Sequence, residues 1–119
     1  MEEQRPLIDW NIVNGLIELG EEDGKSFLKE VINIYISQYP ELFSAMKKGF
    51  EQAQAKEMTL NAHSLKGASL NIGAIQLAEV CREIEMKGRN NDFSGVDRLI
   101  EKVNNVYNLT IEEFQKFLS

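Results

Sequence analysis

Cysteine, histidine and proline are scarce in this sequence, with one, one and two copies respectively in 119 residues. The lone cysteine, Cys81, cannot form an intramolecular disulfide, so we expect a reducing compartment, by default the cytoplasm. A zinc site needs three or four nitrogen, sulfur or carboxylate ligands. A chain with one histidine and one cysteine is therefore not expected to contain a zinc site. The absence of Pro-, Ser- or Gln-rich tracts argues against a disordered chain.

Long apolar runs and an excess of positive charge are also missing. No apolar run approaches the roughly 18 residues needed to cross a bilayer, and residues 1–5 lack the basic patch of a signal peptide. The 13 basic residues are outnumbered by 19 acidic ones, and a net charge of -6 disfavours binding to a nucleic-acid backbone. No glycine-rich phosphate loop is present, so no means of binding ATP is apparent. We therefore expect neither a membrane nor a nucleic-acid partner.

What the sequence does contain is typical of one globular helical domain spanning residues 1–119. Hydrophobic residues make up 43% of the chain and charged residues 27%, and no repeat or linker divides it. The apolar spacing is helical almost throughout. Expected helices cover about residues 9–19, 23–38, 40–53, 56–72, 74–87 and 93–117.

The boundaries of these expected helices depend on a few residues. Pro40 predicts a break and a new helix, whereas Gly20, Gly73 and Gly88 are expected stops. Residues 90–92 form a turn cluster. Because the connections are short, consecutive helices should pack antiparallel in an up-down bundle, which makes the fold all-α.

His63 is the residue that does not fit the core of its own helix. On a wheel with roughly 100° per residue, the buried stripe of this helix lies opposite His63; it consists of Met58, Leu65, Ala68 and Ile72. Four residues share the face of His63, namely Thr59, Lys66, Gly67 and Leu70. The sequence therefore predicts an exposed imidazole with a cation and a glycine beside it.

A lone histidine on a helix is usually a surface residue, and an exposed lysine usually a solvating charge. Gly67 is harder to explain, because a glycine inside a helix costs about 1 kcal/mol relative to alanine. Without a Cβ it lets a bulky group approach closely. An imidazole is a competent nucleophile near neutral pH, and Lys66 could neutralise a phosphoryl group placed on His63. The phosphoryl group would then come from another protein and leave to another protein.

The segment around His63 resembles the signature of the histidine-containing phosphotransfer (HPt) family, in which His-x-Leu-Lys-Gly-x-Ser/Ala is followed by a Gly-Ala turn. It reads Ala62-His63-Ser64-Leu65-Lys66-Gly67-Ala68-Ser69-Leu70-Asn71-Ile72-Gly73-Ala74. The resemblance implies an antiparallel four-helix bundle, here with one or two additional N-terminal helices. It also implies that a receiver-domain aspartate gives its phosphoryl group to the histidine, which passes it to another receiver. In place of the Gly-Asp-like break that relatives often have before the motif, this chain has Ala53 and Gln54.

The resemblance also assigns roles to individual residues. His63 would be phosphorylated at Nε2, Lys66 would stabilise the phosphoryl group, and Gly67 would leave room for the receiver. Ser69 would fix local helix geometry through a hydrogen bond. Glu85 and Arg89 correspond by spacing to positions near the histidine in some relatives. An amide can replace the carboxylate there, and a carboxylate does not favour a phosphate.

A plain structural alternative exists for Glu85. It could simply pair with Arg89 or Arg82 along its own helix, and together with Glu79 and Glu83 it could form a solvated face.

The expected partners are receiver domains of response regulators or hybrid histidine kinases. The catalytic metal would belong to the receiver, and no cofactor is expected on this chain. Expected docking residues around His63 are Thr59, Leu60, Ser64 and Leu70, although the two leucines could equally pack on neighbouring helices.

Three alternatives remain open. The chain could be a docking module without phosphotransfer, or the phosphotransfer segment of a larger histidine kinase, although the start at Met1 favours a free-standing protein. A ferritin-like metal enzyme is disfavoured, because such sites need several Glu-x-x-His pairs.

Overall fold

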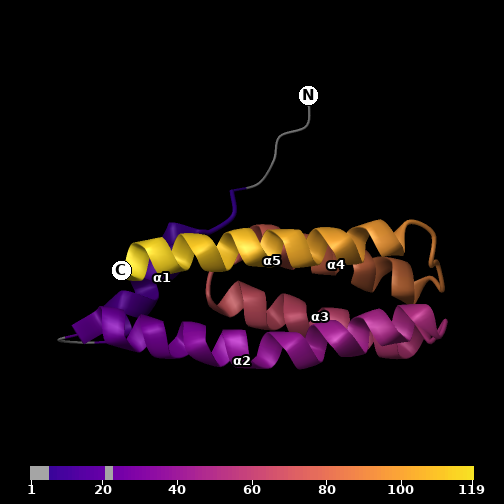
Figure 1. The fold of residues 1–119 in the computed structure, drawn as a ribbon, viewed down its shortest axis with the longest axis horizontal. Coiled ribbons are helices and arrows are strands. Elements are labelled where there is room, and N and C mark those ends of the chain that lie inside the picture. The colour runs from indigo at the N-terminus through magenta and orange to yellow at the C-terminus, as the bar shows by residue number, and fades with distance from the viewer. Residues whose placement is uncertain (1–5, 21–22) are drawn as a thin grey trace.

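The computed structural model describes residues 6–20 and 23–119, and this part of the chain contains five helices and no strand. Figure 1 shows their order and arrangement. They are α1 (Trp10–Leu19), α2 (Gly24–Glu51), α3 (Ala55–Asn71), α4 (Ile75–Arg89) and α5 (Val96–Leu118). None of these helices combines the length and the apolar character that a membrane crossing requires.

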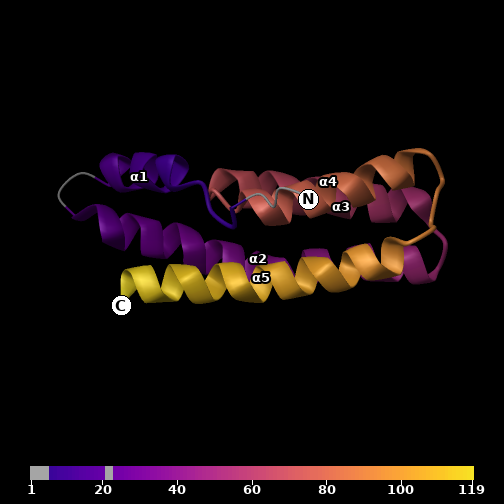
Figure 2. The ribbon, with the colours of Figure 1, turned by 90° about the horizontal axis from the view of Figure 1, so that it is seen from above.

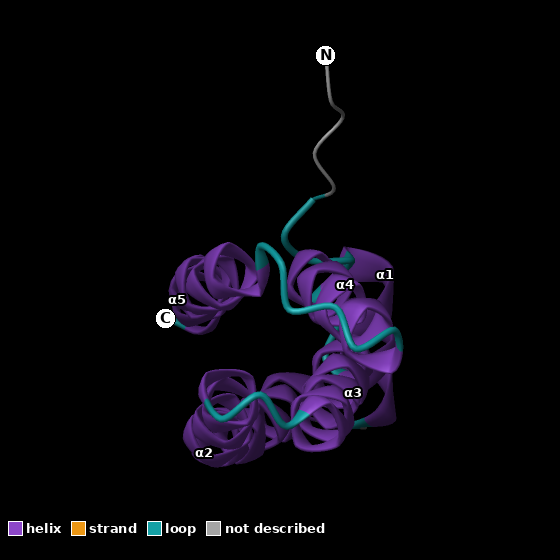
Figure 3. Cartoon of the chain, turned by 90° about the vertical axis from the view of Figure 1, so that its right-hand side faces the viewer, coloured by secondary structure: helices purple, strands orange, loops and turns teal. Residues whose placement is uncertain are grey.

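Helices α2 to α5 form an antiparallel four-helix bundle, as expected. Viewed along the bundle in Figure 3, the four helices occupy the corners of a square, with α3 beside both α2 and α4. The centre is filled by fully buried side chains contributed by all four helices, among them Leu28, Met58, Leu77 and Phe114. Burial of these apolar groups is the main force that holds the bundle together.

One additional helix, α1, precedes the bundle and lies against the first part of α2 (Figure 2). Asp9 caps α1 by accepting a hydrogen bond from the Asn11 amide at 3.0 Å. Trp10 packs on the ring of Phe117 in α5, with ring centroids 5.0 Å apart. The backbone amide of Asp9 also donates to the Gly73 carbonyl at 2.8 Å. The chain entering α1 is therefore fixed to the turn between α3 and α4.

The expected break at Pro40 is wrong, because α2 continues through it to Glu51. A proline inside a helix removes one backbone hydrogen bond and costs about 3 kcal/mol. Pro40 itself is exposed, whereas Tyr39 before it and Met46 after it are buried in the core. Burial of apolar side chains on both sides of the proline outweighs the local penalty.

The remaining helix boundaries follow the sequence with two exceptions. The expected ends at Gly20 and just before Gly73 are confirmed, and Gly73 has a left-handed φ of 80°. Gly88 does not end α4, which continues to Arg89. Instead, a Cβ at Gly88 would overlap the Thr59 hydroxyl of α3, so this glycine permits close helix packing.

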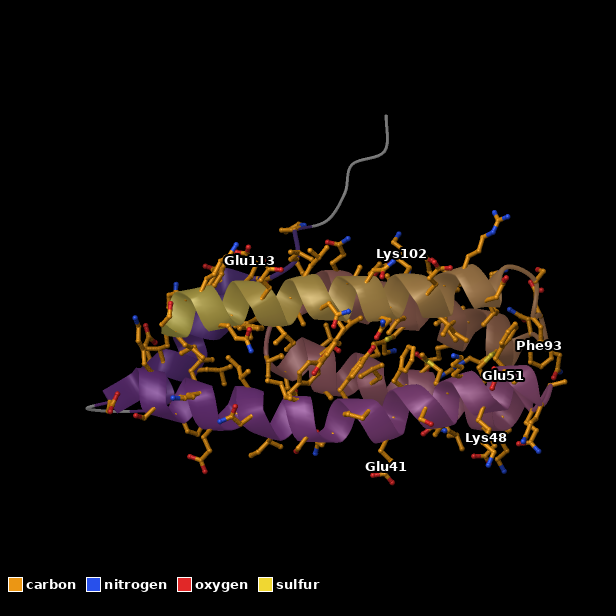
Figure 4. All side chains as sticks on the ribbon, in the orientation of Figure 1. Glu41, Lys48, Glu51, Phe93, Lys102 and Glu113 are labelled. Carbon is orange, nitrogen blue, oxygen red and sulfur yellow. The ribbon has the colours of Figure 1, made fainter. Side chains whose placement is uncertain are left out.

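The last helix begins later than expected, at Val96, and Phe93 lies in the preceding loop. The Phe93 ring packs near Phe50 at the end of α2, with centroids 6.4 Å apart. Figure 4 shows Phe93 at this end of the bundle, and shows Glu41 and Lys102 pointing outward from the bundle. The turn cluster is confirmed, since Asp92 accepts hydrogen bonds from the amide and hydroxyl of Ser94.

Candidate functional site

Helix α3 displays His63 on its outer face. The imidazole side chain is 60% exposed. Of the stripe expected opposite His63, Met58, Leu65 and Ile72 are buried and Ala68 is partly buried. The helical period alone therefore placed the histidine correctly, because one face of α3 is fully engaged by α2 and α4.

The charged groups around His63 converge on one carboxylate, that of Glu85 in α4. The Nδ1 atom of His63 lies 2.8 Å from Glu85 Oε2. Arg89 donates to the same oxygen at 2.7 Å, and the Lys66 ammonium lies 2.7 Å from Oε1. The contact between Lys66 and Glu85 is an ion pair that joins α3 to α4. The sequence predicted a cation beside the ring, and the structure adds that the Lys66 ammonium is paired with Glu85.

Glu85 is buried, with only 3% of its side chain exposed. Burial by itself raises the pKa of this carboxyl, because the charged form loses solvation. Its contacts with Lys66 and Arg89, followed by that with His63, outweigh the burial and lower the pKa to about 2. The carboxylate is therefore ionised at neutral pH, and the expectation that Glu85 belongs to a solvated face is wrong.

Of the two pairings proposed for Glu85 along its own helix, only the one with Arg89 forms. Arg82 pairs instead with Glu79, at 3.5 Å. The family resemblance placed Glu85 near His63, and the sequence itself carries a signal for this approach. In an antiparallel helix pair, residues equally distant from the turn lie opposite each other, and His63 and Glu85 are equidistant from Ala74.

Gly67 leaves open space beside the imidazole. A Cβ built on this residue would meet no heavy atom within 4 Å outside its own helix backbone and chain neighbours. No packing contact therefore requires a glycine at this position. In this respect Gly67 differs from Gly49, where a Cβ would approach the Met58 backbone nitrogen at 2.6 Å.

The four expected docking residues surround His63 at different depths. Leu60 and Leu70 are exposed by 52% and 45%, so neither is buried against a neighbouring helix, and Ser64 is also exposed. Thr59 is only partly exposed, because its hydroxyl donates to the Ala55 carbonyl at 2.6 Å and its side chain lies against Gly88. Three of the four therefore lie on the open surface around the ring.

Grooves flank α3 on both sides of this surface. One, between α3 and α4, has a volume of about 260 Å³ and includes Lys66, Leu70 and Arg82 in its lining. Another, between α2 and α3, has a volume of about 410 Å³ and includes Leu42, Ser64 and Ala68.

Ser69 lies on the buried side of α3, away from His63. Its hydroxyl and that of Tyr35 in α2 share a hydrogen bond of 2.7 Å. This bond joins α3 to α2, rather than acting within α3 as expected. Burial raises the pKa of Tyr35 well above its usual range, so the phenol stays protonated and the bond is kept across the physiological pH range.

No cluster of three or more potential metal ligands occurs among residues 6–20 and 23–119. The lone thiol, Cys81, is buried, and burial raises its pKa to about 12, with a smaller effect from the charge of Glu85. A neutral, enclosed thiol is a poor nucleophile. Of the imidazole and the thiol, only the imidazole of His63 is presented to solvent.

Comparison with known proteins connects this geometry to a family. The model of the Hpt domain matches residues 30–115. The phosphorelay intermediate protein YPD1 of Saccharomyces cerevisiae is 31% identical over 84 residues, which cover 70% of this chain and 50% of that protein. The chain spans between 33% and 50% of the length of the curated relatives it matches.

Two solved structures share the fold at low sequence identity. The histidine-containing phosphotransfer protein HptB of Pseudomonas aeruginosa has a TM-score of 0.80 at 24% identity, covering 95% of both chains. Yeast Ypd1, in its co-crystal structure with the receiver domain of the response regulator Ssk1, has a TM-score of 0.83 at 20% identity, covering 94% of both chains. Since the family model matches well over half of its residues, including the whole histidine segment, this chain belongs to the Hpt domain family.

Proposed function

We propose that this protein is a phosphorelay intermediate. It accepts a phosphoryl group on His63 from the phosphoaspartate of one receiver domain and transfers it to the aspartate of another. The observation that carries the proposal is an exposed imidazole fixed at Nδ1 by Glu85, with Lys66 nearby and open space over Gly67. With Nδ1 engaged, Nε2 is the ring nitrogen available as the nucleophile.

Each side-chain role follows from its place around the ring. Lys66 and His63 contact the same carboxylate, so Lys66 could exchange its contact with Glu85 for one with a phosphoryl oxygen, which would neutralise charge on the transferred group. Leu60 and Leu70 supply exposed apolar surface to the docking face. Gly67 leaves room for the approaching receiver.

The partners we propose are receiver domains of response regulators or hybrid histidine kinases. Support comes from the solved complex in which yeast Ypd1 binds the receiver domain of Ssk1. The protein is a carrier that is itself phosphorylated, rather than an enzyme with its own ATP site. We propose that it needs no cofactor of its own, that the metal ion is supplied by the receiver, and that it acts in the cytoplasm.

The decisive experiment is incubation with a purified receiver domain carrying radiolabelled phosphoaspartate. The wild-type chain should gain label in a form that is stable to base and labile to acid, as a phosphoramidate is. His63→Gln should gain none while keeping the helical circular dichroism of the wild type, because this side chain is largely exposed. Lys66→Ala should transfer more slowly, with a smaller loss than His63→Gln. Acid-labile labelling of His63→Gln would refute the proposal.

A further inference from the structure

Helices α3 and α4 are in close contact at Gly88, one turn away from the candidate site. Gly88 is buried, and a Cβ on it would overlap the hydroxyl oxygen of Thr59 and lie 3.2 Å from both Thr59 Cβ and Met58 Cε. Gly88 follows Glu85 by three residues in α4, and Thr59 precedes His63 by four residues in α3. The glycine contact and the charged cluster therefore occupy adjacent layers of the same helix pair.

The same turn of α3 is also held by a glycine of α2. A Cβ on Gly49 would lie 2.6 Å from the backbone nitrogen of Met58 and 3.0 Å from its Cα, so the backbones of α2 and α3 are in contact here. Helix α3 thus has a close neighbour on each of its two packed sides (Figure 3). Because any movement of α3 would disturb its contact with α2, a larger residue at position 88 would displace α4 from α3.

The Thr59 side chain is poorly placed to relieve such an overlap by rotating. Its hydroxyl donates a hydrogen bond of 2.6 Å to the Ala55 carbonyl, and its branched Cβ restricts the χ1 angle. A carbon and an oxygen atom in contact lie about 3.3 Å apart. A methyl group on residue 88 would therefore require the two helices to separate by about 1 Å at this point.

Building on the function proposed above, we propose that Gly88 is a positioning residue that sets the spacing of α3 and α4 at the cluster of His63, Lys66 and Glu85. The contacts that cross this helix pair are 2.8 Å from Glu85 to His63 and 2.7 Å from Glu85 to Lys66. A side-chain contact of about 3.6 Å is no longer a hydrogen bond, so a separation of about 1 Å is enough to break this arrangement.

The docking surface does not depend on the spacing of α3 and α4. Leu60, Ser64 and Leu70 are exposed and all belong to α3. Gly88 is buried, so it does not itself meet a receiver. A residue that only spaces the two helices should affect the rate of phosphoryl transfer within the complex, and leave the affinity for the receiver unchanged.

The first test measures single turnovers from a phosphorylated receiver domain at increasing concentrations of this chain. This design separates the rate constant at saturation from the half-saturating concentration. Gly88→Ala should lower the rate constant at saturation about tenfold, because a misplacement of about 1 Å in a reacting site can cost that much or more. The half-saturating concentration should stay the same. An unchanged rate constant at saturation, or a change in the half-saturating concentration alone, would overturn the proposal.

A second substitution in α3 should restore the spacing. Thr59→Ala removes the overlapping oxygen, and the contacts of 3.2 Å that remain need only small adjustments. The double variant Thr59→Ala/Gly88→Ala should therefore transfer at the rate of Thr59→Ala alone, and comparison with that single variant removes any effect of Thr59 on docking. Losses that simply add in the double variant would contradict the proposal, and this comparison does not require Gly88→Ala to fold by itself.

Gly24→Ala is the matched control for a loss of stability. A Cβ on Gly24 would overlap the Ile17 carbonyl oxygen, where α1 meets α2, so this variant should lose stability without moving α4. All variants are compared at a temperature where circular dichroism shows them folded. Gly88→Ala should shift the ¹⁵N NMR signals of the His63 ring, the single imidazole of the chain, and Gly24→Ala should keep them and the rate constant at saturation. Equal effects of the two variants would refute a positioning role.

The two proposals fail in different ways. If the wild-type chain gains no label from any phosphorylated receiver, the proposed function is wrong, whatever the ring signals show. If the wild type is labelled and Gly88→Ala transfers equally fast at saturation, the function stands and the inference about Gly88 is wrong.

Discussion

Substitution of Gly67 should raise stability and impair function, and both effects can be measured on the same variant. A glycine in a helix interior is less favourable than alanine by about 0.8–1.0 kcal/mol. Because a Cβ at Gly67 would meet no atom within 4 Å, no clash subtracts from this gain. Gly67→Ala should therefore increase the free energy of unfolding by about 1 kcal/mol, which corresponds to a rise in Tm of about 4 °C for a domain of this size.

The functional effect of the same position should increase with side-chain size. Gly67→Ala places one methyl group beside His63, whereas Gly67→Gln places a long side chain in the space that a receiver would enter. We expect a modest fall in the transfer rate from a phosphorylated receiver for alanine, and a severe one for glutamine. Gly67→Gln should impair docking far more than it affects unfolding.

Gly15 provides a matched control in another helix. It lies inside α1, and a Cβ there also meets no atom within 4 Å. Gly15→Ala should raise the free energy of unfolding by a similar amount, measured by urea denaturation followed by circular dichroism. It should leave the transfer rate unchanged. A wild-type transfer rate in Gly67→Gln would show that the partner does not use this space. A loss of stability in Gly67→Ala would show that the fold itself needs the glycine.

Three further predictions concern stability. Ala53 adopts a left-handed φ of 53° at the turn between α2 and α3, so Ala53→Gly should stabilise the fold by about 1 kcal/mol, measured as the midpoint of urea unfolding. Gly88→Ala should lower stability by about 1–3 kcal/mol in thermal unfolding, because its Cβ would overlap Thr59; an unchanged Tm would contradict this. The pKa of Glu85 falls from 4.5 to about 2 on folding, so its stabilising contribution is complete above pH 4.5 and is lost as the pH falls towards 2. This contribution is at most about 3 kcal/mol. The free energy of unfolding of Glu85→Gln, measured across the same pH range, should not show this decrease.

The hairpin of α3 and α4 could be predicted from the sequence, because local signals agree with the tertiary packing there. The apolar period of α3 fixed its buried face, and Gly73 supplies the left-handed conformation that the turn requires. At Pro40 the local signal and the packing disagree, and the packing prevails. The rule that proline interrupts a helix considers Pro40 alone. It does not take into account that Tyr35, Tyr39 and Met46 are all buried when the helix is continuous.

In the candidate site, the residues that lie on one helix could be predicted from the sequence, whereas the contact made by a second helix could not. His63, Lys66 and Gly67 lie within about one turn of each other, so the geometry of one helix places them together. Glu85 comes from another helix, and in the sequence it resembles any solvated glutamate of an amphipathic segment. Its burial becomes favourable only when cations from α3 and α4 are both present, which no property of a single helix can indicate.

The arrangement also answers the objection that a carboxylate beside the histidine should repel a phosphate. Glu85 contacts the Nδ1 edge of the ring, whereas the phosphoryl group is expected on Nε2, so the ring lies between the two anions. Lys66 and Arg89 carry two positive charges against the single negative charge of Glu85, and the cluster stays positive overall. Moving the Lys66 ammonium to a phosphoryl oxygen exchanges its ion pair with Glu85 for one with another anion. After that movement Glu85 keeps Arg89 and gains the imidazolium as a partner, so the buried carboxylate is never left without a counter-charge.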